Sequence, residues 1–165
     1  MKFILLISLS LVSHAQSYSQ IRTVTTSRLM GSTYKYVNEL PPFKGYKEQI
    51  GTMLLPTEDN YAVSVVAKGQ YNVLILDTCL KEGASVKYKI LDTAIIGMIP
   101  RNQTIVTSDC RLRQKNDSYI IAIVKPDDKK YYKNVVRAWR FDRPSRKLRR
   151  MRVEHIDCLS EGYNL

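Results

Sequence analysis

Short apolar runs recur along the chain at near-regular intervals, separated by polar turns. Residues 86–91 alternate between apolar and polar side chains, which is the period-two pattern of a strand with one face in solvent. Residues 61–67 and 71–77 are rich in apolar and aromatic side chains, and the three-residue loop between them contains Gly69, as in many β-hairpins. Similar patterns predict strands over residues 33–37, 104–113, 118–124 and 131–141, and a buried strand or a bend over 94–98.

The segments between these runs are predicted as connections, with one exception. Residues 40–45 contain two consecutive prolines, which cannot donate to a strand ladder and therefore indicate a loop. Residues 78–85 are predicted as a loop and residues 114–117 as a turn, whereas residues 46–55 are predicted as a short helix. With roughly seven or eight strands and no long helix, the chain is predicted to be all-β, an antiparallel meander forming a small sandwich or barrel.

The first residues follow a different pattern. Lys2 precedes an apolar run over residues 3–12, and Ser13-His14-Ala15 places small residues at positions −3 and −1 of a cut before Gln16. This is the pattern of a secretory signal peptide. We therefore predict a signal peptide over residues 1–15, a single all-β domain over residues 16–165, and an exported protein that is periplasmic or secreted. No later stretch has the roughly 20 apolar residues of a transmembrane helix, so no transmembrane segment is predicted.

Export changes the interpretation of the three cysteines, because an oxidising compartment permits disulfides. Cys79, Cys110 and Cys158 are an odd number, so the simplest outcome is one disulfide and one thiol. The sequence leaves all three pairings open. Cys79–Cys110 is favoured because both residues fall at predicted strand ends in the central part of the chain. The alternative is that all three are reduced and buried as small apolar residues.

Positive charge is concentrated near the C-terminus. The formal net charge is +11, and residues 129–152 contain eleven Lys and Arg against one acid, Asp142. The strand at 131–141, a turn at 142–146 and a return strand at 147–153 make a predicted basic hairpin, which also contains the single Trp, Trp139. Strict alternation places Val135, Arg137, Trp139 and Phe141 on one face. In the simplest interpretation Trp139 and Phe141 are core, and the cations protect an edge strand from sheet-to-sheet aggregation.

The more specific hypothesis is that this hairpin binds a polyanion, since arginine grips phosphate, sulfate or carboxylate in a bidentate manner. The predicted partner is an acidic polysaccharide, an anionic surface or an acidic protein, and export makes nucleic acid a less natural partner. Trp139 is the candidate for stacking on a ligand. The candidate binding residues are Arg137, Arg140, Arg143, Arg146, Lys147, Arg149, Arg150 and Arg152.

Enzymatic chemistry finds little support in the sequence. After removal of the leader, His155 is the single histidine, and the common nucleophile, zinc, P-loop and dinucleotide motifs are absent. We therefore predict a non-enzymatic binding protein without cofactor or metal. The alternatives are a structural, envelope-associated protein with no specific ligand, and a hydrolase that uses an unidentified carboxylate pair. A hydrolase of this kind requires a concave pocket lined by two close acids.

The C-terminal region carries one resemblance. The leader, Arg137-Ala138-Trp139-Arg140 and the run from Cys158 to Tyr163 resemble small uncharacterised exported proteins of Bacteroidetes-like bacteria. The resemblance covers mainly the last thirty residues. It implies a bacterial periplasmic or secreted setting and no particular activity.

Overall fold

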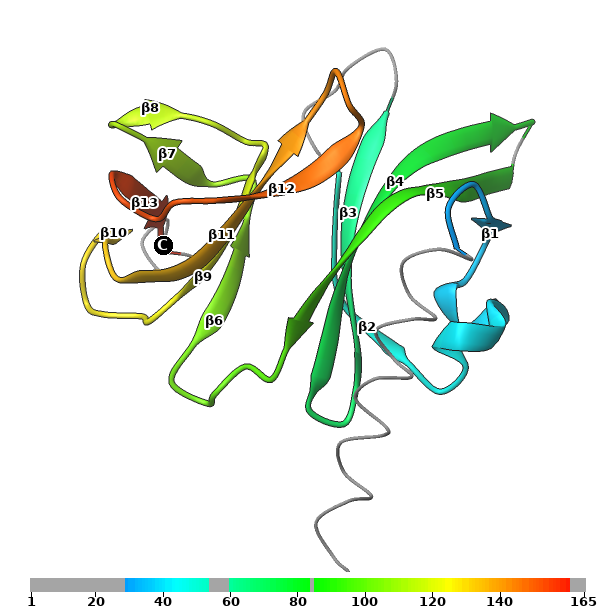
Figure 1. The fold of residues 1–165 in the computed structure, drawn as a ribbon, viewed down its shortest axis with the longest axis horizontal. Coiled ribbons are helices and arrows are strands. Elements are labelled where there is room, and N and C mark those ends of the chain that lie inside the picture. The colour runs from blue at the N-terminus through cyan, green and yellow to red at the C-terminus, as the bar shows by residue number, and fades with distance from the viewer. Residues whose placement is uncertain (1–28, 54–59, 84, 161–165) are drawn as a thin grey trace, which may run out of the picture.

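The computed structural model describes residues 29–53, 60–83 and 85–160, so the predicted signal peptide lies outside the described residues. The described strands, in chain order, are β1 Thr33–Tyr34, β2 Lys47–Met53, β3 Tyr61–Lys68, β4 Tyr71–Glu82, β5 Ser85–Gly97, β6 Thr104–Thr107, β7 Cys110–Leu112, β8 Lys115–Asn116, β9 Ile120–Val124, β10 Tyr131–Tyr132, β11 Val135–Asp142, β12 Lys147–Met151 and β13 Ile156–Leu159. They form three antiparallel sheets (Figure 1). The N-terminal sheet has the order β1-β5-β4-β3-β2, the central sheet β12-β11-β9-β6, and the C-terminal sheet β10-β13-β7-β8. The predicted all-β antiparallel fold is confirmed.

The three sheets stack in layers because each buries an apolar face against the next. The core between the N-terminal and central sheets contains Val63 and Leu76 from one side and Phe141 and Trp139 from the other. A second core, between the central and C-terminal sheets, includes Ala122, Ile156 and residues of both sheets around them. The central sheet is therefore covered on both faces.

Strand β9 explains why residues 118–124 have the most continuous apolar pattern in the chain. All five of its residues are buried. Ile121 and Ile123 face the N-terminal sheet, whereas Ile120, Ala122 and Val124 face the C-terminal sheet. A strand covered on both faces needs apolar residues at every position, so alternation is absent.

Residues 29–46 cover the outer face of the N-terminal sheet. They contain β1 and two 3-10 turns, η1 Val37–Glu39 and η2 Pro41–Phe43, at the right of Figure 1. Phe43 is 1% exposed and packs with Leu29, Tyr46 and Ile75 in a third core. The predicted loop at residues 40–45 is thus mainly a 3-10 turn, in which the prolines occupy positions that need no N–H donor.

Several predicted boundaries are wrong, each for a non-local reason. The helix predicted over residues 46–55 is wrong: β2 is a strand that pairs with β3 and has a register shift between Glu48 and Ile50. The predicted loop at residues 78–85 is mostly strand, because β4 continues to Glu82 and pairs with β5 along its length. Segments 86–91 and 94–98 belong to the single strand β5, whose pairing with β4 has two register shifts. Sequence-local patterns do not reveal such bulges.

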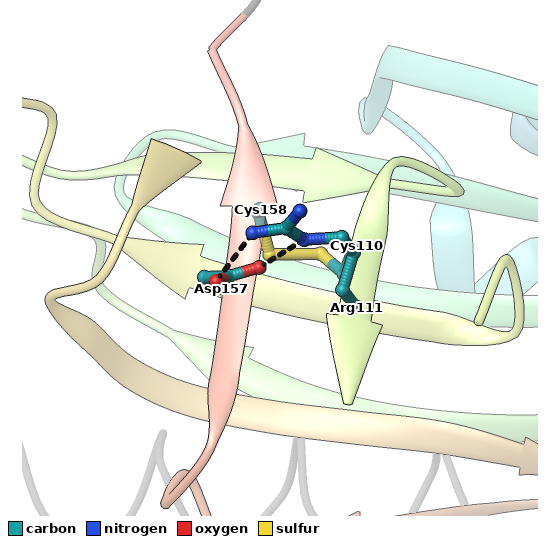
Figure 2. Close-up of polar contacts among 4 residues, drawn as sticks. All are labelled: Cys110, Arg111, Asp157 and Cys158. Atoms are coloured by element: carbon teal, nitrogen blue, oxygen red, sulfur yellow. Dashed lines mark hydrogen bonds and ion pairs between the residues drawn. A yellow bond between two sulfur atoms is a disulfide. The ribbon is translucent and has the colours of Figure 1, made fainter. Parts of the chain in front are cut away.

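The disulfide joins Cys110 to Cys158, which corrects the favoured Cys79–Cys110 pairing. These two residues lie directly opposite each other on β7 and β13, with an S–S distance of 2.05 Å (Figure 2). Cys79 lies on β4 in the N-terminal sheet and takes part in no disulfide. The central sheet separates these two positions, so Cys79 cannot reach Cys110. A disulfide of this kind is typical of proteins from an oxidising compartment.

The cross-strand pair next to the disulfide adds a second link between β7 and β13. Arg111 donates from Nε and Nη2 to the two carboxylate oxygens of Asp157, at 2.7 and 2.8 Å (Figure 2). The guanidinium carbon of Arg111 also lies 3.4 Å from the ring centroid of Tyr131 on β10. Hydrogen bonding to Asp157 raises the pKa of Arg111. Arg111 on β7 therefore contacts both β13 and β10 and helps to hold the three strands of the C-terminal sheet together.

Candidate anion-binding groove

The hairpin formed by β11 and β12 carries most of the predicted binding residues, but a bulge changes which face each one occupies. The pairing of β11 with β9 shifts register between Val135 and Arg137. As a result Val135 and Ala138 both face the C-terminal sheet, while Trp139 and Phe141 face the N-terminal sheet. Strict alternation had placed Val135 with Trp139, and the extra residue at Val136 is the reason for the difference.

Trp139 and Arg137 do not belong to a binding surface. Trp139 is 6% exposed in the core between two sheets, so its ring cannot stack on a ligand. Arg137 is half-buried and donates to the backbone carbonyl oxygens of Ile96 and Met98, the latter at 3.2 Å. Its guanidinium carbon lies 6.0 Å from the Trp139 ring centroid. Arg137 therefore connects the central sheet to the end of β5.

Arg140 and Arg149 remain exposed and lie side by side. They face each other across the β11–β12 ladder, on the same face as Ala138 and Met151, two residues away on each strand. Arg140 donates from Nε to Asp117 at 2.8 Å. Asp117 is held in turn by the backbone N–H of Tyr119, at 3.1 Å. Arg140 is thus ion-paired with Asp117 at the side of this arginine pair.

Next to this arginine pair is a hollow of about 670 Å³ between the β7–β8 hairpin and the end of β12. Both elements lie on the same side of the molecule (Figure 1). Met151 contributes to the hollow, and because it shares a face with Arg149 the hollow and the arginine pair adjoin. We call this combined surface the basic groove. Its cations are Arg113, Lys115, Arg140, Arg149 and Arg152.

Backbone geometry brings Arg113 and Lys115 to the groove. Arg113 and Gln114 have positive φ angles of 52° and 65°, which suit a tight two-residue turn between β7 and β8. The backbone N–H of Arg113 donates to the carbonyl oxygen of His155 at 2.8 Å. This bond joins the β7–β8 hairpin to the segment after β12. Sequence reasoning missed both cations because they lie outside the basic hairpin, and no local pattern indicated this contact.

The other predicted binding residues lie away from the groove or at its margin. Arg143 and Arg146 are exposed in the turn between β11 and β12. Lys147 shares a face with Arg149 but is paired in register with Asp142. Arg150 lies opposite Trp139, on the other face of the hairpin. Of the eight predicted binding residues, the groove therefore brings together Arg140, Arg149 and Arg152.

A smaller hollow of about 190 Å³ lies on the outer face of the N-terminal sheet, lined in part by Glu48. Asp77 is close to it, but this residue is fully buried and bonded to Tyr34, and it does not line the hollow. The two-carboxylate pocket that a hydrolase requires is therefore not supported here.

Over the part of the chain that the structure describes, no helix is long and apolar enough to cross a membrane. Comparisons with protein-family models, curated proteins and solved structures found no match, so the resemblance of the C-terminal region to exported proteins of Bacteroidetes-like bacteria stays a prediction.

Proposed function

We propose that this chain is an exported, non-enzymatic binding protein whose basic groove holds a segment of an acidic polysaccharide. The observation that carries the proposal is the convergence of five cations from three separate chain segments on the basic groove: three line the hollow, and Arg140 and Arg149 adjoin it. They come from the β7–β8 hairpin, from β11, and from β12 with the residue after it. Planar guanidinium groups grip carboxylate or sulfate in pairs, and four of the five cations are arginines.

Edge protection accounts for only part of this arrangement. Cations that block sheet-to-sheet pairing belong on the edge strand itself. β8 and β12 are both edge strands, so this role fits Lys115 and Arg149. Arg113 lies in the β7–β8 turn, Arg140 on the interior strand β11 and Arg152 beyond the end of β12, where edge protection does not apply. The backbone N–H of Leu148 on β12 already donates to the carboxylate of Asp92 at 2.8 Å, which covers part of that edge. Arg113, Arg140 and Arg152 therefore call for another explanation, and an anionic ligand supplies one.

The shape of the site favours a chain over a flat surface as the partner. A hollow with cations on opposite sides can surround a single extended polymer, whereas a flat anionic membrane contacts only its rim. The remaining described lining consists of the apolar residues Leu112 and Met151 and, on the segment after β12, the acid Glu154 and His155. The predicted leader and the disulfide support an exported setting, where polysaccharides are accessible.

The test compares two double variants of the mature chain that lose the same charge. Arg140→Gln with Arg149→Gln removes two groove cations, whereas Arg143→Gln with Arg146→Gln removes two from the exposed turn. Binding is measured calorimetrically to polygalacturonate and heparin, with anionic liposomes and duplex DNA as comparators. We expect the groove variant to lose about 100-fold in affinity for one polysaccharide, at roughly 1.5 kcal/mol for each charge-assisted contact. The turn variant should lose less than about 5-fold.

Salt dependence separates a specific site from general charge attraction. Loss of two contacts should make the slope of log affinity against log salt shallower by roughly 1.5 in the groove variant. Equal losses in both double variants, or binding to all four polyanions that disappears together near 150 mM salt, would leave the structural alternative as the better explanation. Preferential binding to liposomes would instead identify a membrane surface as the partner.

A further inference from the structure

The smaller hollow lies on the opposite side of the N-terminal sheet from the central sheet, and it shares no lining residue with the basic groove. It is lined by residues of strands β2 and β3 together with Tyr34, Lys35, Val37 and Tyr88. At about 190 Å³ it is smaller than pockets for drug-sized ligands, which are typically 300–1,000 Å³. Its size therefore suits a ligand of only a few non-hydrogen atoms.

The negative charge at this hollow comes from a carboxylate on β2. Glu48 is exposed and lines the hollow. Position 51 is glycine, and a Cβ atom built there would clash with Glu48 Oε1. Gly51 thus leaves room for the Glu48 carboxylate to lie across the strand. An alanine at this position would displace that carboxylate.

A second carboxylate lies behind the lining. Asp77 is fully buried, directly opposite the lining residue Ala62 on the β3–β4 ladder. Its Oδ2 accepts a hydrogen bond from the Tyr34 hydroxyl at 2.9 Å, but its Oδ1 has no hydrogen-bond partner among the described residues. Burial, together with repulsion from Glu48, raises the pKa of Asp77 to about 7, although the bond from Tyr34 opposes this rise. Near pH 7 Asp77 is thus only partly ionised, and a positive charge bound in the hollow would favour its ionised form.

The remaining lining accepts hydrogen bonds and offers aromatic surface. The proton of the Tyr34 hydroxyl is used by Asp77, so the Tyr34 oxygen presents lone pairs. Burial and the Asp77 charge raise the pKa of Tyr34, which keeps its hydroxyl protonated. The rings of Tyr34 and Tyr88 lie 5.7 Å apart with a tilt of 31°. Among the described lining residues the cation is Lys35, whose ammonium lies 5.4 Å from the exposed ring of Tyr36, a residue outside that lining.

We propose that this hollow binds a small organic cation, with a primary ammonium group bonded to Glu48 and to the Tyr34 oxygen and the attached carbons against Tyr88. A carboxylate, a phenol oxygen and aromatic faces are the groups that recognise ammonium ions in proteins. The buried Asp77 carboxylate strengthens this attraction from behind the lining. The site operates in a chain of net charge +11, so the attraction has to be local.

The experiment uses three probes of nearly equal size and different charge: butylammonium, butan-1-ol and butyrate. Each is titrated into the ¹⁵N-labelled mature chain, and backbone amide shifts are followed at Ser64 and Tyr88 as reporters of the hollow. We expect saturable shifts with butylammonium at a Kd on the order of 1–10 mM, as suits so small a ligand. Butan-1-ol and butyrate should bind at least about 10-fold more weakly, because neither supplies the positive charge.

Three variants assign the effect to named groups. Glu48→Gln should weaken butylammonium binding by about 10-fold, since it removes the direct partner. Gly51→Ala should weaken it less than Glu48→Gln does, because the Glu48 carboxylate is the end of an exposed, flexible side chain that is shifted and not removed. Asp128→Asn removes an exposed acid on the β9–β10 connection and should leave the affinity unchanged.

The proposal is overturned if butan-1-ol shifts the same amides with the same affinity, because the hollow would then be only apolar. It is also overturned if Glu48→Gln binds as tightly as the unmodified chain. The shift pattern of each variant without ligand shows whether it is folded. Since the groove variants carry none of these substitutions, failure here leaves the proposed polysaccharide site intact.

Discussion

Replacement of Asp77 by asparagine should make the chain less sensitive to pH, because Asp77 is the one fully buried acid among the described residues. Its pKa rises from 3.8 to about 7 in the folded protein, chiefly through burial. A difference of about three pKa units corresponds to about 4 kcal/mol. This is the free energy that an ionised Asp77 costs the folded state relative to the unfolded chain.

Proton binding by Asp77 determines whether the free energy of unfolding rises or falls with pH. Between pH 3.8 and about 7, the folded chain keeps the Asp77 proton that the unfolded chain has released. The folded state therefore binds more protons, and the free energy of unfolding falls as pH rises through this window. The contribution of Asp77 is fully present below pH 3.8 and lost above about pH 7. Asp77→Asn has no such proton, so its curve should be flatter.

Urea denaturation at pH values from 4 to 8 measures this difference. The stability of Asp77→Asn relative to the unmodified chain should improve by about 4 kcal/mol between the two ends of the range, with a steepest slope of about 1.4 kcal/mol per pH unit. At pH 4 the difference in stability between the two proteins depends on how well the asparagine side chain is hydrogen-bonded. The change of that difference with pH is therefore the quantity to compare. Other titrating groups are shared by both proteins and largely cancel.

Tyr34→Phe provides the matched check. The hydroxyl of Tyr34 lowers the pKa of Asp77, so its removal should raise that pKa further and extend the loss of stability to higher pH. Parallel pH curves for the unmodified chain and Asp77→Asn would refute the reasoning. They would mean that another group already compensates the buried carboxylate in the folded chain.

Two further predictions concern stability. Replacement of Cys110 and Cys158 together by alanine should lower the free energy of unfolding by about 4 kcal/mol in the chain-entropy model, given a sequence separation of 48. In the same urea titration Cys79→Ala should have a much smaller effect. Equal losses of stability in the two variants would contradict the assigned pairing. Phe141→Ala should lower the free energy of unfolding by about 3–5 kcal/mol, because this side chain is 1% exposed and meets two tyrosine rings edge-on. Val136→Ala, at an exposed position of the same strand, should change it by no more than about 0.5 kcal/mol. A small loss of stability for Phe141→Ala would contradict its place in the core.

The elements that could be predicted from sequence are those whose pattern is local. Residues 61–67 and 71–77 were recognised as a hairpin, and β3 and β4 form one, because apolar composition and Gly69 are sufficient signals. The apolar run at residues 118–124 predicted β9, although not the reason for it. Only the stacked sheets show that both of its faces are covered.

The features that could not be predicted depend on contacts between distant segments. β2 is a strand because β3 pairs with it, although its own sequence contains Gly51 and has no strong strand pattern. The disulfide depends on the register of β13 against β7, and β13 was not predicted at all. Strict alternation along β11 failed at one bulged residue, Val136.

The candidate site shows the same division. The sequence located the positive charge in the β11–β12 hairpin, and Arg140, Arg149 and Arg152 do belong to the groove. The sequence could not distinguish these residues from Arg137, whose guanidinium donates to backbone carbonyl oxygens. It also could not show that Arg113, from a neighbouring hairpin, belongs to the groove. Charge density along a chain identifies a region, whereas the choice of residues requires the fold.

The position of β9 between two cores has a consequence for amide hydrogen exchange. Its backbone amides pair with β6 or β11 inside a sheet that is covered on both faces, so local fraying cannot expose them. They should exchange only through global unfolding, at the slowest rates in the described chain. Because the same strand contributes to both cores, the layers on either side of it should lose protection together, as one cooperative unit, and not as two separately melting halves.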